Sequence, residues 1–144
     1  MKHAEFYPSL KTNNEIIDGQ HKALIDAINN LYDAIDSGAG PEGAKKALDF
    51  LAQYTIFHFG GEEKLWAANG YPLFTEHKAA HDAFVKTVRD LYLDLDKNGL
   101  TDDFAKRVEK EVTNWLINHI QGADMKGIEW LNTRINNKFM ENML

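Results

Sequence analysis

His58 and Glu62 stand four residues apart inside a helical pattern of apolar residues, and this pair limits what the chain can fold into. At that spacing both side chains leave the same face of a helix, one turn from each other. The apolar residues Leu51, Tyr54 and Leu65 fall on that same face. The imidazole and the carboxylate therefore point where a hydrophobic core is expected. Because the burial of unpaired polar groups is costly, we expect both to have partners elsewhere in the chain.

Apolar residues recur at alternating spacings of three and four along four segments, which predicts four amphipathic helices. These segments cover about residues 15–36, 41–68, 75–98 and 102–124. Glycine, asparagine and proline lie between them, as expected for short loops. Helices joined by short loops pack as antiparallel neighbours. The sequence therefore predicts an all-α fold, an antiparallel up-down-up-down four-helix bundle.

The two ends of the chain extend this bundle, which we place at residues 15–124. We interpret residues 1–14 as an ordered but irregular N-terminal arm, and we expect residues 125–144 to form a C-terminal helical extension. The apolar residues of the extension are Ile128, Leu131, Ile135 and Phe139. A chain of 144 residues is long enough for one hydrophobic core and too short for two of ordinary size. We therefore expect a single domain, 1–144.

Charge and composition exclude several kinds of partner. The chain carries a net charge of -6, whereas nucleic acids and anionic membranes attract basic surfaces. No apolar run has the length of a membrane span or of a signal peptide. We therefore expect a cytoplasmic protein that contacts neither nucleic acid nor membrane. There is no cysteine, so a metal site would use only nitrogen and oxygen ligands.

Histidine replaces an apolar residue at five places in the predicted helix faces. One histidine on an apolar face is usually an ordinary core residue, and the HxxxH spacing of His77 and His81 is by itself a weak metal signal. Five together would carry five separate penalties for buried polar groups. We therefore interpret them as metal ligands: His21, His58, His77, His81 and His119. The sixth histidine, His3, lies near the N-terminus and is expected to be solvated.

Asp124 follows His119 by five residues, a spacing that an ideal helix does not bring to one face. Five residues place the two side chains roughly 140° apart around the helix axis. A π-type bulge or a loosened turn near Gly122 would let them converge, and such bulges are frequent at functional sites. The alternative is that the regular helix simply ends there.

The candidate ligands number too many for one tetrahedral zinc ion. Five imidazole nitrogens and two carboxylates, Glu62 and Asp124, suit two six-coordinate ions if each carboxylate gives one oxygen to each ion. With a shared solvent-derived oxygen, this count leaves one coordination position open. Nitrogen-rich ligation favours iron over magnesium or calcium. An open position in an apolar bundle is a site for a small ligand such as O₂.

Taken together, the motifs resemble those of the hemerythrin family, specifically the bacterial hemerythrin-like proteins. The resemblance covers about residues 15–130. It rests on IDGQH at 17–21, HFGGE at 58–62, GYP at 70–72, HKAAH at 77–81 and WLINHI at 115–120, with Asp124 five residues after the last histidine.

The resemblance implies a centre of two iron ions joined by an oxo or hydroxo bridge. One iron would be held by His77, His81 and His119, and the other by His21 and His58 with its sixth position vacant. Glu62 and Asp124 would bridge the two. In the family this vacant position binds O₂ reversibly.

Several residues beside the candidate ligands have two alternative interpretations each. The apolar side chains near the ligands are ordinary core or the lining of an O₂ pocket: Leu24, Phe59, Trp115, Leu116 and Ile120. Glu63 is expected to face away from the core, because adjacent helical residues do. Asp18 could hydrogen-bond the arm or a ligand imidazole, and a surface or capping role is an equal alternative.

We expect reversible O₂ binding without enzymatic activity, for oxygen carriage and storage or as the O₂-sensing domain of a chemotaxis-type signalling protein. A sensor could act on a signalling domain or partner through the C-terminal extension. The alternative is a di-iron peroxidase or an enzyme that handles nitric oxide. A ferritin-like site would need Glu-xx-His pairs, which the chain does not have. A metal-free bundle with histidines in its core predicts that chelators leave stability unchanged.

Overall fold

Nearly all of the chain that the computed structural model describes is helical. The description covers residues 4–143, apart from the side chains of residues 136–139 and 141–142, so the predictions for His3 and for the side chain of Phe139 lie outside it. The elements are the 3₁₀ turn η1 (Pro8–Leu10), α1 (Glu15–Asp36), α2 (Gly40–Asn69), α3 (Phe74–Asn98), α4 (Asp102–Arg107), the π-helical η2 (Val108–Asn114), α5 (Trp115–His119), the π-helical η3 (Ile120–Asp124) and α6 (Met125–Met143).

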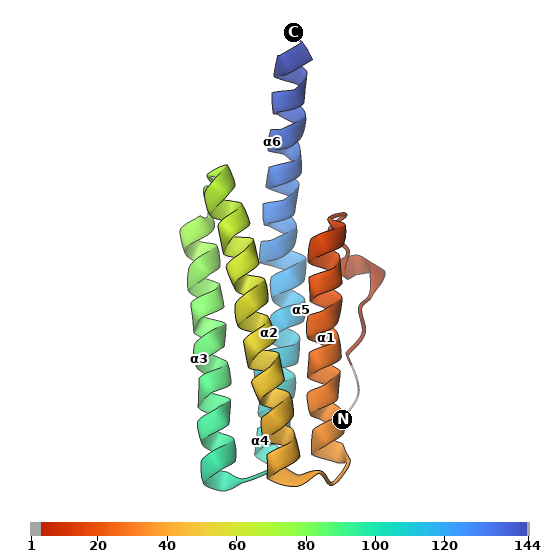
Figure 1. Ribbon diagram of the computed structural model, residues 1–144, viewed down its shortest axis with the longest axis vertical. Helices are drawn as coiled ribbons and strands as arrows, with labels where there is room; N and C mark the ends of the chain where they lie inside the picture. The colour runs from red at the N-terminus through yellow and green to blue at the C-terminus, as the bar shows by residue number, and fades with distance from the viewer. Residues whose placement is uncertain (1–3, 144) are drawn as a thin grey trace.

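These elements form the expected four-helix bundle, with the last five joined end to end as one continuous rod (Figure 1). Successive helices run in opposite directions, and α6 projects beyond the ends of its neighbours. The all-α fold is therefore confirmed. No helix in the described part of the chain has the length and hydropathy needed to cross a membrane.

Local capping signals set the ends of the helices. The side chain of Asn14 accepts a hydrogen bond from the backbone N–H of Ile17 at 3.1 Å, and Thr101 accepts one from Phe104 at 3.0 Å. Both satisfy a backbone donor that the first turn of a helix leaves free. At the other end of α2, Gly70 adopts a left-handed conformation with φ of 69°, which a residue without Cβ adopts at little cost.

The predicted helix faces account for most of the core. On α3 every residue predicted to face inward is buried: His77, His81, Phe84, Val88, Leu91 and Leu95. On α2 the prediction was partly wrong, because Trp66 is fully buried whereas Leu65 is only half-buried. Trp66 is buried because it packs in a second apolar cluster with Ile128 and Leu131 of α6, which the periodicity of α2 alone does not reveal.

The N-terminal arm lies along α1 and is held by side-chain hydrogen bonds (Figure 1). Asp18 accepts from the backbone N–H and the hydroxyl of Thr12 at 2.9 and 2.8 Å, so of its predicted roles the contact with the arm is confirmed. Asn29 exchanges two hydrogen bonds with the backbone of Ala4, at 2.8 and 2.9 Å. Leu10 is fully buried in the core. In the described part of the arm, residues 4–14, the irregular chain is therefore fixed to the bundle.

The start of α6 completes the core at the end of the bundle where α2 passes into α3. Ile128 and Leu131 are buried against Ile17, Trp66 and Tyr71. Further along, Ile135 is 54% exposed. Among the described side chains of this apolar stripe, Ile128 and Leu131 pack on the bundle and Ile135 does not.

Gly127 is required by its close contact with a large buried side chain. A Cβ added at this position would lie 2.7 Å from two ring carbons of Trp66, which is 0% exposed. We expect Gly127→Ala to destabilise the protein by about 1–2 kcal/mol, because overpacking a rigid indole outweighs the gain in helix propensity. Gly19→Ala is the matched control, since nothing lies within 4 Å of a Cβ in this exposed turn of α1. It should stabilise by about 0.5–1 kcal/mol. Urea unfolding of both variants would measure the difference, and equal changes would contradict the predicted contact.

Candidate metal centre

Seven buried donors from all four bundle helices meet in one place. The structure brings together every predicted ligand: His21 from α1, His58 and Glu62 from α2, His77 and His81 from α3, His119 from α5 and Asp124 from η3. Their potential ligand atoms form two groups, each lying within 4.8 Å. We call them the three-histidine group (His77, His81, His119) and the two-histidine group (His21, His58). Glu62 and Asp124 belong to both.

The carboxylate of Glu62 divides its two oxygens between these groups. Oε1 lies 3.3 Å from Nε2 of His77 and 3.2 Å from Nε2 of His81. Oε2 lies 3.1 Å from Nε2 of His58 and 3.4 Å from Nε2 of His21. Each oxygen therefore faces the imidazoles of one group, which is the arrangement that a carboxylate bridging two ions needs.

The two carboxylate oxygens of Asp124 are divided between the two groups in the same way. Its Oδ1 lies 3.0 Å from Nε2 of His77 and 3.1 Å from Nε2 of His119. Its Oδ2 lies 2.9 Å from Nε2 of His21. Both carboxylates thus connect the same two groups of imidazoles.

The π-helical segment η3 brings Asp124 to the centre. It spans Ile120–Asp124, directly after His119. Because its hydrogen bonds join residues five apart, the wider turn places side chains at that spacing on nearly the same side. Of the two alternatives considered for this stretch, the bulge is confirmed and an end of the helix is wrong. The other π-helical segment, η2, had no signal that we recognised in the sequence.

The donors have the chemistry of a site for metal ions. Both ring nitrogens of His21, Nε2 of His58, Oε2 of Glu62 and Oδ1 of Asp124 are buried without a well-formed hydrogen bond. In addition, Nε2 of His81 faces Nε2 of His119 at 3.2 Å. Buried polar atoms of this kind are costly unless something else satisfies them. Imidazole and carboxylate ligands without thiolate suit iron and related first-row ions, so the residues fit the implied iron pair.

Two side chains contact imidazoles of the candidate ligands at Nδ1, the ring nitrogen that faces away from the centre. Nδ1 of His58 lies 2.6 Å from Oε1 of Gln20, and Nδ1 of His81 lies 3.0 Å from Oε2 of Glu63. The expectation that Glu63 faces away from the core was therefore wrong. Although Glu62 and Glu63 point in different directions around α2, α3 packs beside it and presents His81 within reach of Glu63. Gln20 was not predicted to contact His58, and its position next to His21 was the one signal that could have indicated it.

Aromatic rings support the three-histidine group. Phe59 stacks on His81 with ring centroids 3.7 Å apart, and Trp115 stacks on His119 at 4.6 Å. The other predicted pocket residues, Leu24, Leu116 and Ile120, are buried, while Trp115 is half-buried. The structure thus places Phe59 and Trp115 against ligand rings, and the role of all five residues in lining an O₂ pocket stays a prediction.

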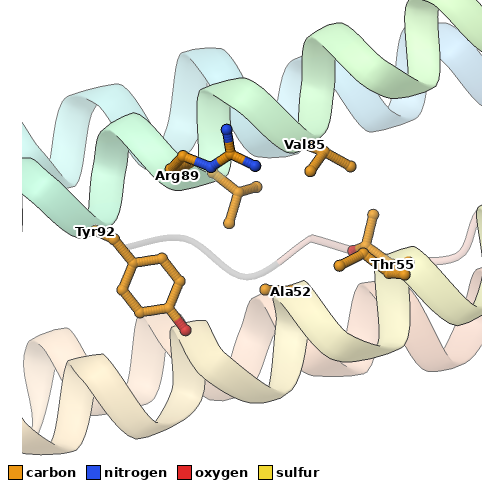
Figure 2. Close-up of a pocket in the computed structure, with 7 residues that line it drawn as sticks. Ala52, Thr55, Val85, Arg89 and Tyr92 are labelled. Atoms are coloured by element: carbon orange, nitrogen blue, oxygen red, sulfur yellow. The ribbon is translucent and has the colours of Figure 1, made fainter.

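Hollows in the surface approach the centre from two sides. One, of about 240 Å³ between α1 and α2, is lined by Gln20 and Glu62 among others. A second, of about 500 Å³ between α2 and α3, reaches Phe59, Glu63 and His81. Further along the same groove a third hollow of about 190 Å³ contains none of the seven donors (Figure 2). Its lining residues are Ala52, Thr55, Ile56, Val85, Val88, Arg89 and Tyr92.

The carboxylates and imidazoles of the metal-free centre shift each other's pKa values. Burial alone would lower the pKa of His21 and of His77, but their contacts with Asp124 and Glu62 outweigh it and raise both to about 9. Burial would raise the pKa of Glu62 and of Asp124, and the adjacent histidines instead hold both well below their usual range. Without metal, the cluster is therefore held together by buried charge pairs.

These shifts predict how the metal-free protein responds to pH. A histidine whose folded pKa lies above its unfolded value stabilises the fold below about pH 6.5 and loses this contribution as the pH rises through about 9. We therefore expect the chelated protein to lose on the order of 1 kcal/mol or more between pH 6.5 and 9. Metal ions bind neutral imidazoles, so the metal-loaded protein should lose no folding stability between these pH values. Thermal unfolding at both pH values, with and without metal, tests this difference, and parallel curves would contradict it.

Comparison with known proteins agrees with this arrangement. A family model described as the hemerythrin HHE cation binding domain matches residues 12–131. A bacteriohemerythrin of Pseudomonas aeruginosa is 30% identical over 124 residues, which cover 86% of this chain and 78% of that protein. A bacteriohemerythrin of Methylococcus capsulatus is 34% identical over 113 residues, covering 78% and 84%. A hemerythrin-like protein of Naegleria gruberi is 38% identical over 120 residues, covering 79% and 81%.

Proposed function

This chain belongs to the hemerythrin family, and from that premise we propose that it binds O₂ reversibly at a non-haem di-iron centre. The observation that carries the proposal is the division of the carboxylate oxygens of Glu62 and Asp124 between two groups of imidazoles. An isolated core histidine would not need such an arrangement. A site for a single ion would not need two groups of imidazoles that share both carboxylates.

Each group of donors has a definite task in this proposal. The three-histidine group holds one ion and the two-histidine group the other, with Glu62 and Asp124 shared. When bound, the two irons supply the electrons and the coordination position that O₂ needs. Because the two-histidine group has one imidazole fewer, it would leave a coordination position of its ion for O₂.

The surroundings of the centre favour binding over turnover. Leu24, Leu116 and Ile120 are each at most 1% exposed, and they bring no acid or base to the centre. A dry apolar lining keeps water from the bound ligand. We therefore propose that these side chains retain O₂ rather than activate it for a further substrate.

The visible spectrum of the iron-loaded protein tests this proposal. Anaerobically reduced protein with two irons per chain should develop a charge-transfer band when air is admitted and lose it again under vacuum. Rapid conversion to a ferric form, together with turnover of added peroxide or nitric oxide, would instead support the enzymatic alternative. Iron well below two per chain would contradict the dinuclear centre itself.

The position of Asp124 favours sensing as a second candidate function. This residue ends η3, and α6 begins at the next residue and continues beyond the bundle. A movement of Asp124 on ligand binding would therefore displace the start of α6, which projects beyond the bundle. Hydrogen exchange in residues 125–143, with and without O₂, separates the two roles. A sensor should change its protection there, whereas a carrier should not.

A further inference from the structure

The two side chains that accept hydrogen bonds from Nδ1 of the candidate ligands differ in charge. Nδ1 of His81 faces the carboxylate of Glu63 at 3.0 Å, and Nδ1 of His58 faces the amide oxygen of Gln20 at 2.6 Å. An imidazole that binds a metal through Nε2 carries its proton on Nδ1, so both rings donate a hydrogen bond to these acceptors. The carboxylate serves the three-histidine group, and the neutral amide serves the two-histidine group.

The negative charge of Glu63 is only weakly compensated by a neighbouring cation. Lys78 is its nearest cation at 4.0 Å, but Lys78 lies closer to Asp82, at 2.9 Å. The side chain of Glu63 is 21% exposed, so solvent only partly screens its charge. Its negative charge is therefore directed at the Nδ1 proton of one ligand imidazole.

A hydrogen bond to an anion makes an imidazole a stronger electron donor than one to a neutral amide does. A stronger donor stabilises a ferric ion more than a ferrous ion. The contact with Glu63 should therefore lower the reduction potential of the ion in the three-histidine group. The contact with Gln20 has a much smaller effect of this kind on the other ion.

We propose that Glu63 and Gln20 are positioning residues that make the two irons electronically unequal. The carboxylate favours the oxidised state at the three-histidine group, and the amide leaves the ion with the open position easier to keep reduced. This inference rests on the proposed di-iron function and adds the residues that distinguish the two ions.

Reciprocal substitutions test the inference without relying on O₂ binding. Glu63→Gln removes the charge but keeps an acceptor for His81, and Gln20→Glu introduces a charge beside His58. Glu76→Gln is the matched control, because it makes the same change to an exposed carboxylate next to His77 that belongs to neither group of candidate ligands. The readout is a potentiometric titration of iron-loaded protein, in which dithionite supplies one electron for each ferric ion reduced.

We expect Glu63→Gln to raise one of the two reduction potentials and Gln20→Glu to lower one. A tenfold change in the relative affinity for ferric and ferrous ion corresponds to 59 mV for one electron, and outer contacts of this kind are worth about 10–100-fold. Glu76→Gln should shift neither potential comparably. If Glu63→Gln behaves like Glu76→Gln, or if Gln20→Glu raises the potential, the inference is overturned.

A Co²⁺ titration of the metal-free proteins distinguishes this failure from failure of the proposed function. The unsubstituted protein should bind two Co²⁺ ions per chain, and Glu63→Gln should still bind two, with one about tenfold more weakly. Two ions bound with unchanged affinities in the variant would overturn the inference alone. Fewer than two ions in the unsubstituted protein would overturn the dinuclear centre on which it rests.

Discussion

Replacing Glu62 by alanine will reduce the iron content from two ions per chain to fewer than one and remove the visible band of the loaded protein. The carboxylate of Glu62 lies within 3.4 Å of Nε2 of four histidines. The substitution therefore takes one ligand from each ion at once. Since even outer contacts change metal affinity about 10–100-fold, the loss of a shared ligand should be larger. Iron analysis after gel filtration, together with the visible spectrum, measures the effect.

Glu76→Ala is the matched control for this experiment. Glu76 is an exposed carboxylate next to His77 in the first turn of α3, and it belongs to neither group of candidate ligands. Its replacement should leave two irons per chain. If Glu62→Ala also retained two irons and the band, the carboxylate would not be a shared ligand, and the proposed centre would be wrong.

Removing the metal will lower the thermal stability of the protein strongly. A ligand that binds only the folded state at a free concentration a thousandfold above its Kd adds about 4.1 kcal/mol for each site. For a domain of this size each kcal/mol corresponds to roughly 2–4 °C in Tm, so two ions should account for at least about 16 °C. Calorimetry of iron-loaded and chelated protein at one pH measures the difference.

The Glu62→Ala variant also serves as the control for metal removal. Because it lacks a shared ligand, its Tm should respond to added iron by only a small fraction of the shift expected for the unsubstituted protein. A metal-free bundle with histidines in its core predicts the same Tm before and after chelation. That outcome would remove the basis of the di-iron proposal.

Much of the fold was predictable from the chain because helical periodicity is a local property. The inward face of α3, from His77 to Leu95, follows directly from spacings of three and four. Capping residues such as Thr101 likewise act on their own helix. The five histidines and Glu62 were found in the same way, since each interrupts an apolar face with a polar group that requires a partner. Asp124 was instead found from its spacing after His119 and from the family resemblance.

Other features depended on how the helices pack against each other. The sequence left two alternatives at Asp124, and only the fold shows the π-helical turn that brings it to His119. The contact of Trp66 with Gly127 joins two helices that are far apart in the chain. The position of Glu63 on α2 predicts that it faces outward, yet His81 of α3 lies within hydrogen-bonding distance of it.

The chain alone therefore determined which residues face inward and which of them carry donor atoms. The tertiary structure decided which oxygen of Glu62 faces which imidazoles, and which acceptor each Nδ1 meets. The physical reason is the range of the interactions. The rotation of one residue relative to the next is set by backbone hydrogen bonds within a helix, whereas the distance between side chains on different helices depends on the packing of all four at once.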